Sequence, residues 1–231
     1  MTKPAEKGKV RKRDSQRTQK SLLTAAAKEF AQFGYAGARI NRIADKAKCN
    51  IRMLYHYFGS KEKLYLAVLE SAYLDLREKE SDLAIEFLPP LEGLTRLLEF
   101  TFDYFDSNPV FEGLLRAENL MRGKYIKRLP SVPNAAVPML EKVSALIKVG
   151  EEEGVFRPGL DAADLYLTIT AFSRFHLANS YSLSAVLGVD MNSAEWKAER
   201  LRRCSEMLEA YLVYGATDRQ PLKGKAAADA R

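Results

Sequence analysis

Apolar residues recur at helical spacing along nearly the whole chain, and no segment shows the apolar–polar alternation of a strand. The first such segment has apolar residues three and four positions apart, at Leu22, Leu23, Ala26, Ala27, Phe30 and Phe33. This pattern predicts a helix over 14–33 that ends before Gly34, because glycine commonly terminates helices. We therefore expect an all-α fold.

Two short helices joined by a tight turn are predicted next. The first contains Ile40, Ile43, Ala44 and Ala47 and ends near Lys48. The second begins after Asn50, an effective N-cap residue, and contains Met53, Leu54, Tyr57 and Phe58. This arrangement is typical of a helix-turn-helix, whose second helix enters the DNA major groove by its N-terminal turn.

Proline and glycine divide the rest of the chain into further helices. We expect helices over 61–87, 91–106 and 109–123, a loop or broken turn over 124–138, and a helix that ends at 153. Two more follow, over about 161–187 and 192–214, which gives about nine helices in total.

The segment 165–187 contains only two residues that can carry a charge near neutral pH, Arg174 and His176. A helix so poor in charge must be covered over most of its surface, and this one is too polar for a bilayer. The last helix carries an apolar stripe at Leu201, Cys204, Leu208, Tyr211 and Leu212. We expect the segment 165–187 to pack on its own core with one face and on a partner subunit with another.

The net charge of +6 is unevenly distributed along the chain. Residues 1–63 hold 16 basic against 5 acidic residues, and residues 64–231 hold 20 against 25. A basic segment on an acidic remainder is typical of a polyanion-binding head on a body with another role. Six of the basic residues lie in the first thirteen positions, so a solvated basic tail is the alternative.

Several classes of protein are excluded by what the sequence lacks. No apolar run is long enough to span a membrane, and the N-terminus is too polar for a secretory signal, so we expect a cytoplasmic protein without a membrane partner. Cys49 and Cys204 lie far apart, which favours neither a disulfide nor a zinc site. We expect no metal and no cofactor. An enzyme is not expected either, because His56 and His176 fall in separate predicted domains and no phosphate-binding glycine loop is present.

The second short helix carries the residues suited to reading DNA. Ile51, Arg52 and Met53 lie in its first turn, near base edges, and an arginine there can donate to guanine. Further along, near phosphates, are Tyr55, His56 and Lys61. The alternative for His56 is a plain surface histidine, and Tyr57 and Phe58 are expected in the core.

These residues resemble the DNA-binding domain of the TetR/AcrR family of repressors. The resemblance covers about fifty residues, in the runs AAAKEFAQFGYAGA and INRIADKAKCNIRMLYHYFGSKEKLYLAVL. The matching blocks are Phe30 with Gly34 and Tyr35, Ile43 with Ala44, the run 54–58, and Ser60, Lys61 and Glu62 with Leu64. The resemblance implies that Tyr55 and Lys61 contact phosphates, that Ser60 caps the next helix, and that residues 51–53 face the bases.

The chain departs from the family pattern at two places. The turn has Lys48, Cys49 and Asn50 where Gly-Val-Ser is common, so we expect a left-handed residue at Lys48, at a cost of ~1 kcal/mol, and a cap by Asn50. Ala38 and Arg39 replace a Thr-Ser/Thr pair, so the hydroxyl cap is missing and Arg39 is expected to supply a charge contact instead. The DNA-binding candidates are therefore Arg39, Asn50, Ile51, Arg52, Met53, Tyr55, His56 and Lys61.

For the rest of the chain, the resemblance implies a body that binds a small-molecule effector and dimerises through its last two helices, 161–187 and 192–214. The candidate effector residues are Phe102, Phe105, Glu118, Asn119, Tyr166, Phe172, Arg174 and His176. Arg174 and His176 are the strongest, because a buried charge requires a partner. An internal pair between Arg174 and Glu118 would explain Arg174 equally well.

The resemblance also implies the overall function and organisation. The function is that of a dimeric, ligand-responsive repressor that an effector releases from a palindromic double-stranded operator; a sequence-tolerant architectural DNA binder is the alternative. The organisation has four parts: a disordered basic arm over 1–13, a helix-turn-helix domain over 14–60, a ligand-binding and dimerisation domain over 61–215, and a disordered tail over 216–231.

Overall fold

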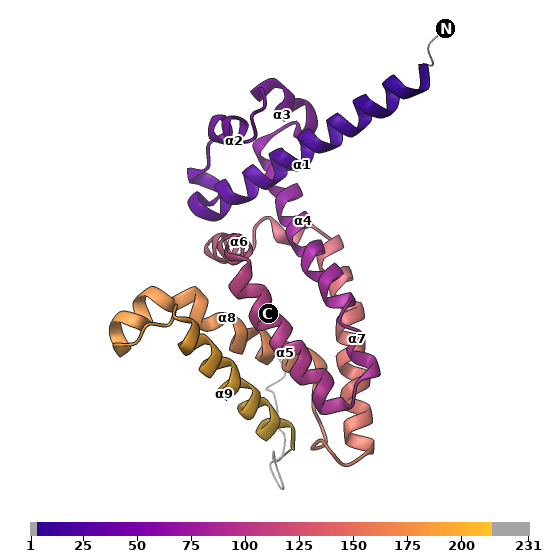
Figure 1. The fold of residues 1–231 in the computed structure, drawn as a ribbon, viewed down its shortest axis with the longest axis vertical. Coiled ribbons are helices and arrows are strands. Elements are labelled where there is room, and N and C mark those ends of the chain that lie inside the picture. The colour runs from indigo at the N-terminus through magenta and orange to yellow at the C-terminus, as the bar shows by residue number, and fades with distance from the viewer. Residues whose placement is uncertain (1–3, 214–231) are drawn as a thin grey trace, which may run out of the picture.

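The computed structural model describes residues 4–213, with side chains from Ser15 onward, and all regular structure in this range is helical (Figure 1). The helices are α1 (Pro4–Gly37), α2 (Ile40–Lys46), α3 (Ile51–Phe58), α4 (Lys61–Ser81), α5 (Pro90–Ser107), α6 (Pro109–Leu120), α7 (Ser131–Glu152), α8 (Ala162–Leu187) and α9 (Ala194–Val213). Two 3₁₀ turns, η1 (Ile85–Phe87) and η2 (Ile126–Arg128), complete them. The expected all-α fold of about nine helices is confirmed over these residues.

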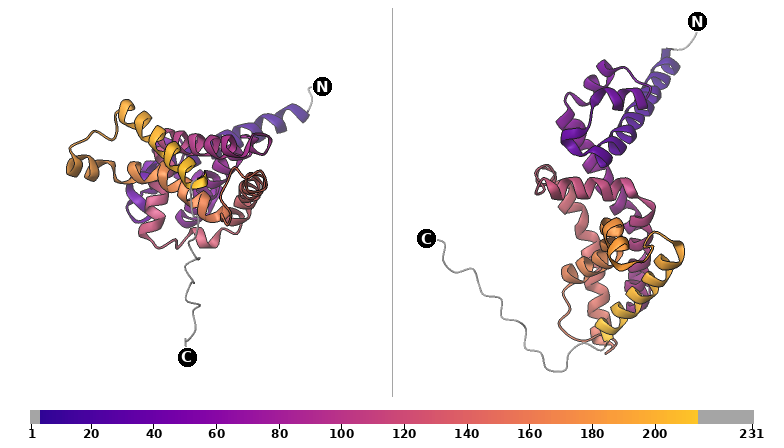
Figure 2. Two further views of the ribbon diagram at one scale, coloured as in Figure 1. Left: turned by 90° about the horizontal axis from the view of Figure 1, so that it is seen from below. Right: turned by 90° about the vertical axis from the view of Figure 1, so that its left-hand side faces the viewer.

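The head of the molecule consists of α1, α2 and α3, and α4 leads from it into the body (Figures 1 and 2). The apolar spacing noted in the sequence places Leu22, Phe30, Ile43 and Leu54 in one fully buried cluster. Leu64 and Leu69 at the start of α4 belong to the same cluster, so the first turns of α4 are part of the head's core. Among the described residues, no helix combines the length and the apolar character that a membrane crossing demands.

The body is built from α4 to α9, with α5 at its centre. Helix α5 packs against α7, α8 and α9, and its buried face supplies Leu94, Leu97 and Leu98. Residues of α9 complete this second core through Cys204, Leu208 and Leu212, on the stripe that the sequence predicts. The side chain of Tyr211, also placed on that stripe, is instead partly exposed.

Helix α6 joins the head to the body, because it packs along α1. Gly113 of α6 faces Ala31 of α1, and a Cβ atom on residue 113 would lie 2.8 Å from the carbonyl oxygen of Ala31 and 2.9 Å from its Cβ. Only a glycine permits this approach. The two helices therefore meet backbone to backbone at this point.

Three helix boundaries differ from the sequence prediction. Helix α1 begins at Pro4, ten residues before its expected start, so part of the predicted 1–13 arm is helical; Gly34 does interrupt α1 as expected, with φ of 64°. Helix α4 ends at Ser81 rather than at 87, because Ala84 adopts a left-handed conformation and turns Ile85 into the core. The predicted tail over 216–231 lies outside the described residues.

The third difference concerns α7, which begins at Ser131 inside the segment predicted to be a loop. Pro133 lies in the first turn, where a missing N–H costs nothing. Pro138 lies inside the helix and removes one backbone hydrogen bond. Burial of Val132 and Met139 offsets this loss.

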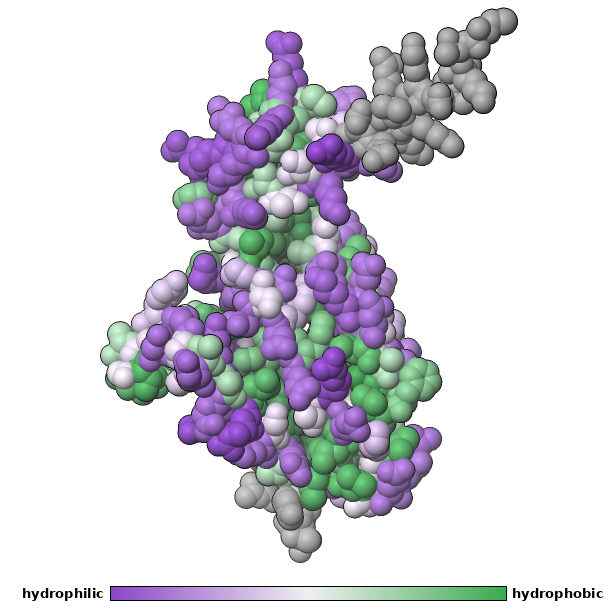
Figure 3. Space-filling model, viewed as in Figure 1, coloured by the Kyte–Doolittle hydropathy of each residue, from purple (hydrophilic) through white to green (hydrophobic). Residues whose placement is uncertain are grey.

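Helices α8 and α9 form a hairpin that projects from the side of the body (Figures 1 and 2). Large apolar side chains on α8 are exposed there, including Phe175 at 60% and Tyr181 at 87%, together with Leu167, Val186 and Leu187. The space-filling view shows mostly hydrophilic side chains over the head and a mixture of apolar, near-neutral and hydrophilic ones at the end of this projection (Figure 3). A monomer would leave this apolar surface in water.

Candidate nucleic-acid interface

Helix α3 presents its first turn to solvent while the rest of it anchors the head. Leu54 and Phe58 are buried in the head's core, four residues apart on one face. Ile51, Arg52 and Met53 are exposed, as are Tyr55 and His56 on the following turn. The predicted burial of Phe58 is confirmed, and Tyr57 is half-buried, with its hydroxyl 3.1 Å from the Ser15 hydroxyl.

The turn between α2 and α3 forms without the usual glycine. Lys48 adopts the predicted left-handed conformation with φ of 51°. The side-chain oxygen of Asn50 accepts a hydrogen bond from the backbone N–H of Arg52 at 2.8 Å, which caps α3 as expected. In the same way, the Ser60 hydroxyl accepts from the Lys63 N–H at 3.1 Å and caps α4. These caps fix the direction of α3.

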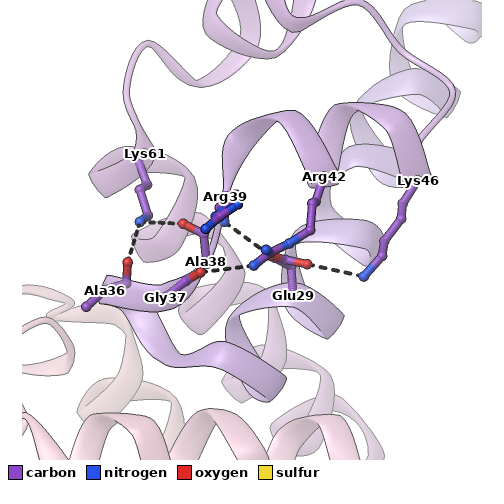
Figure 4. Close-up of polar contacts among 8 residues, drawn as sticks. All are labelled: Glu29, Ala36, Gly37, Ala38, Arg39, Arg42, Lys46 and Lys61. Atoms are coloured by element: carbon purple, nitrogen blue, oxygen red, sulfur yellow. Dashed lines mark hydrogen bonds and ion pairs between the residues drawn. The ribbon is translucent and has the colours of Figure 1, made fainter.

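The start of α2 lacks a side-chain cap, as its Ala38-Arg39 sequence predicts, and a buried carboxylate replaces it (Figure 4). The Oε1 atom of Glu29 accepts from the Arg39 backbone N–H at 3.1 Å and from Arg42 Nε at 2.6 Å. The other oxygen pairs with Lys46 Nζ at 3.2 Å. Glu29 itself is inaccessible to solvent, so one carboxylate of α1 orients both ends of α2.

The surroundings of Glu29 keep it ionised. Burial alone would raise the pKa of this carboxyl, but the hydrogen bonds from Arg42, from the Arg39 backbone and from Lys46 outweigh burial and hold the pKa below its ordinary value. Sequence reasoning missed this residue. The available signal was its position four residues after Ala25, on the apolar stripe of α1, where a carboxylate requires partners.

Two of the predicted phosphate contacts have different surroundings. The side chain of Arg39 is exposed beside α2 and is available to DNA. The ammonium of Lys61 is half-buried and donates to the backbone carbonyls of Ala38 at 2.7 Å and Ala36 at 3.4 Å (Figure 4). Lys61 therefore holds the end of α1 against α4, and a phosphate would have to compete with these two carbonyls.

The proposed pair between Arg174 and Glu118 is wrong, because Arg174 of α8 pairs with Glu112 of α6. The contact is bidentate, with Nε and Nη2 at 2.5 and 3.0 Å from the two oxygens of the nearly buried carboxylate. Glu118 instead accepts from the backbone N–H groups of Tyr125 and Ile126 at 3.1 and 3.0 Å. The partner of Arg174 is thus internal, although not the expected one.

A second polar cluster that the sequence did not predict lies between α4 and α8. Glu80 is buried, and its oxygens bind Arg77 at 2.5 Å and the Tyr166 hydroxyl at 2.7 Å. Tyr166 was predicted to line an effector site, and its hydroxyl is held by this cluster, with Arg77 also donating to it at 2.7 Å. The Nε of Arg77 and the hydroxyl of Thr170 are buried nearby without partners among the described residues.

His176 lies in an aromatic environment deep in the body. Its ring stacks on Phe102 of α5, with 4.9 Å between ring centroids, and lies 5.4 Å from Trp196 of α9. The side chain is 3% exposed, and neither ring nitrogen makes a hydrogen bond of good geometry among the described residues, although a weak interaction with the Phe172 backbone favours the protonated form. Burial, together with the nearby Arg200 cation, lowers the pKa of His176 to about 4. The imidazole is therefore neutral at neutral pH.

The remaining effector candidates do not converge on one place. Phe105 is buried against Phe111, and Phe172 packs on the core around α5. Asn119 is exposed on α6, and its side chain donates to the Leu115 carbonyl at 2.9 Å. It therefore does not line the interior of the body. Among the described residues, no group of three or more histidine, cysteine or acidic side chains could hold a metal ion.

Two family models match the chain on either side of the head–body boundary. The model described as bacterial regulatory proteins, tetR family, matches residues 22–68, which cover the helix-turn-helix. The model described as the tetracyclin repressor-like C-terminal domain matches residues 90–208, which cover most of the body.

Individual relatives agree with these matches. The chain is 33% identical over 198 residues to the HTH-type transcriptional repressor NicS of Pseudomonas putida, covering 86% of this chain and 93% of NicS. The structure of SCO4942 from Streptomyces coelicolor superposes with a TM-score of 0.64 at 25% identity, covering 84% and 98% of the two chains. The structure of FadR from Bacillus subtilis in complex with stearoyl-CoA has a TM-score of 0.62 at 17% identity, covering 86% and 100%.

Proposed function

Because the chain belongs to the TetR family of bacterial regulatory proteins, we propose that it is a dimeric repressor released from a palindromic DNA operator by a small-molecule effector. The comparisons support a DNA-binding transcriptional regulator. The operator symmetry, the dimer and the release are the proposal.

The exposed first turn of α3 is the observation that carries the DNA-binding role. Arg52 lies in this turn between Ile51 and Met53, and a bidentate arginine–guanine pair is the commonest specific contact in the major groove. Asn50, Tyr55 and His56 flank the turn and are suited to phosphates. Arg39, at the start of α2, adds an exposed positive charge, while its backbone N–H is bound by Glu29. Such a charge is suited to a phosphate contact.

The dimer is supported by the apolar surface of α8 and α9. Phe175 and Tyr181 are exposed on the same helix as the exposed Leu167, Val186 and Leu187, and an apolar surface of this kind typically marks a protein–protein interface. Few charged residues lie on α8, so a second copy of the chain can cover this surface without burying charges. Two α3 helices related by a dyad then reach two half-sites, which makes the operator palindromic.

The effector site is proposed in the body, between α5, α8 and α9. His176 supports it, because a buried imidazole without hydrogen bonds of good geometry destabilises the protein, and a ligand that offers a donor or acceptor relieves this cost. Phe102, Phe172 and Trp196 supply apolar surface beside it. FadR, which has the same fold, was solved with stearoyl-CoA, so the fold can hold a small molecule.

The first experiment is selection of random duplex DNA by the full-length protein, followed by sequencing of the enriched pool. We expect a two-fold palindrome of two short half-sites. Enrichment of no sequence, despite binding that weakens with salt, would reject the specific repressor and favour an architectural DNA binder.

Effector release is tested separately with the selected operator. Trp196 is the only tryptophan in the chain and contacts His176, so its fluorescence reports ligands at this site. Compounds that change this fluorescence are expected to weaken operator binding in a gel-shift assay. Compounds that change the fluorescence and leave the operator affinity unchanged would contradict release through this site.

A further inference from the structure

A groove at the junction of head and body is separate from the proposed effector site. It has a volume of about 370 Å³ and lies between α1, α4, the end of α5 and α6. None of the effector residues predicted from the sequence lines it. This volume falls within the range of small-molecule sites in proteins.

The floor of the groove is apolar and comes from both parts of the molecule. Leu23 and Ala27 of α1 form the head side, and Val68 and Ala72 of α4 form the middle. The body side is formed by Val110, Phe111 and Leu114 of α6. A bound apolar group would therefore contact head and body at once.

The rim of the groove carries two cations without partners. Lys20 and Lys28 lie on the same stripe of α1, two helical turns apart, and neither ammonium has a partner among the described residues. The acidic residue of the lining, Asp75, is already engaged by Lys79 at 2.7 Å and by the Tyr104 hydroxyl at 3.1 Å. The uncompensated charge at the groove is thus positive.

From this combination we propose that the groove binds a small amphipathic carboxylic acid, with its apolar part over Ala72 and Phe111 and its carboxylate at Lys20 and Lys28. The apolar floor favours an apolar group on the ligand, and the two lysines at the rim favour a negative charge. The two together match a molecule with one acidic end.

Binding at this place also affects DNA recognition. The groove walls belong to α1 of the head, to α4, which connects head and body, and to α6 of the body, so the width of the groove depends on the angle between head and body. A ligand that fits one width stabilises one head orientation and shifts the population toward it. This regulatory step rests on the DNA-binding function proposed above, whereas the binding step does not.

Calorimetric titration of the full-length protein with butyrate, hexanoate and octanoate tests the binding step. Each added methylene that enters the groove is expected to tighten binding about fourfold. Hexanamide, the neutral analogue of hexanoate, is expected to bind about fivefold more weakly because it lacks the charge. Equal affinity for all three acids, or no binding of octanoate at millimolar concentration, would overturn the proposal.

Two variants locate the bound acid. The double variant Lys20→Gln with Lys28→Gln removes the charges without changing the packing and is expected to weaken octanoate binding about fivefold or more. Ala72→Phe fills the floor of the groove and is expected to abolish octanoate binding. Lys148→Gln, an exposed lysine of α7, is the matched control and should bind as the unmodified chain does. Unchanged octanoate affinity in the double variant would place the acid elsewhere and overturn the groove site.

The regulatory step is measured as the operator dissociation constant with and without saturating octanoate. We expect a change of at least fivefold, matched by the same change in octanoate affinity when operator is present. Octanoate that binds the groove and leaves operator affinity unchanged would overturn this step alone. Failure of the random DNA selection without octanoate would reject the proposed repressor and leave the groove site standing.

Discussion

The carboxylate of Glu29, which is inaccessible to solvent, lies 2.6 Å from the Nε atom of Arg42 and thereby ties α1 to α2. Its second oxygen pairs with Lys46, and the backbone of Arg39 completes its hydrogen bonds. A single side chain therefore aligns the helix that supports α3. The hydroxyl cap common in the family is replaced here by a buried charge.

Replacement of Glu29 by glutamine removes this charge and leaves Arg42 and Lys46 without their partner. We expect a loss of about 3 kcal/mol in the free energy of unfolding at pH 7. Urea unfolding followed by circular dichroism measures it. Glu195→Gln, at an exposed carboxylate of α9, is the control and should change stability by less than about 0.5 kcal/mol. An equal effect of both substitutions would contradict the role of Glu29.

The Glu29 network also has a pH dependence with a defined sign. Its pKa is lower in the folded protein than the ordinary value of 4.5, so the folded state favours the ionised form. The stabilisation is present above pH 4.5 and is lost as the pH falls through the folded pKa. Glu29→Gln is therefore expected to remove part of the acid sensitivity below pH 4.5.

Arg52 and Arg39 are expected to act differently on DNA. Arg52→Ala removes a base contact and should weaken operator binding by about 1–3 kcal/mol and relax preference at one position of each half-site. Arg39→Ala removes a phosphate contact and should weaken all sequences alike, with the slope of log affinity against log salt reduced by about 0.9 per subunit. Fluorescence anisotropy titrations at several salt concentrations separate the two. Loss of sequence preference in Arg39→Ala, with none in Arg52→Ala, would reverse the assignment.

A charge on the exposed face of α8 is expected to separate the proposed dimer. Phe175→Glu would bury an unpaired carboxylate on each side of the interface at a cost of about 3 kcal/mol or more, so the dissociation constant should rise at least about 100-fold. Light scattering across a dilution series measures the molar mass. Phe87→Glu is the control, because Phe87 is an 83% exposed aromatic residue outside the α8–α9 hairpin. A dimer that survives Phe175→Glu would place the interface elsewhere.

His176 is expected to make the protein less stable in mild acid. Its pKa falls from 6.5 to about 4 on folding, because burial and Arg200 oppose the charged form and outweigh Asp106. Below pH 6.5 the unfolded chain binds a proton that the folded chain does not, so stability falls by up to about 1.4 kcal/mol per pH unit. His176→Leu should flatten this slope between pH 6.5 and 5, where Glu29 does not yet contribute. Urea unfolding at fixed protein concentration measures it, with His56→Gln as the exposed control.

Gly113→Ala tests the contact between α6 and α1. The added Cβ would lie 2.8 Å from a backbone oxygen of α1, so the helices must move apart. We expect a loss of about 1–3 kcal/mol in the free energy of unfolding. Arg116→Ala, on the exposed face of the same helix, is the control. Equal stability of Gly113→Ala and the unmodified chain would show that the helices do not meet as described.

The sequence was most informative where structure depends on near neighbours. The left-handed Lys48, the caps by Asn50 and Ser60, and the buried face of Leu54 and Phe58 all follow from residues within one or two helical turns. Such features depend on side-chain chemistry and helical spacing alone. The head was therefore predicted in some detail.

The sequence was less informative where two distant segments meet. Glu112 and Glu118 lie on one helix, about 120° apart around its axis, and only the crossing of α6 and α8 determines that Glu112 faces Arg174. The start of α7 differs from the prediction for another reason. Pro130, Pro133 and Pro138 together favour a break, but the first two lie at the N-terminus of α7, where a helix tolerates proline, and burial of Val132 and Met139 offsets the third. The crossing of α6 with α8 and the burial that offsets Pro138 both lie outside the local pattern.

The approach of Gly113 to Ala31 also determines how movement passes between the two parts of the molecule. Side chains at an interface absorb small displacements by changing rotamer, but backbone atoms have no rotamers to change. The contact between these residues therefore acts as a rigid pivot. A translation of α6 must displace α1 by a similar amount, whereas a rotation about this contact keeps it intact and changes the angle between head and body.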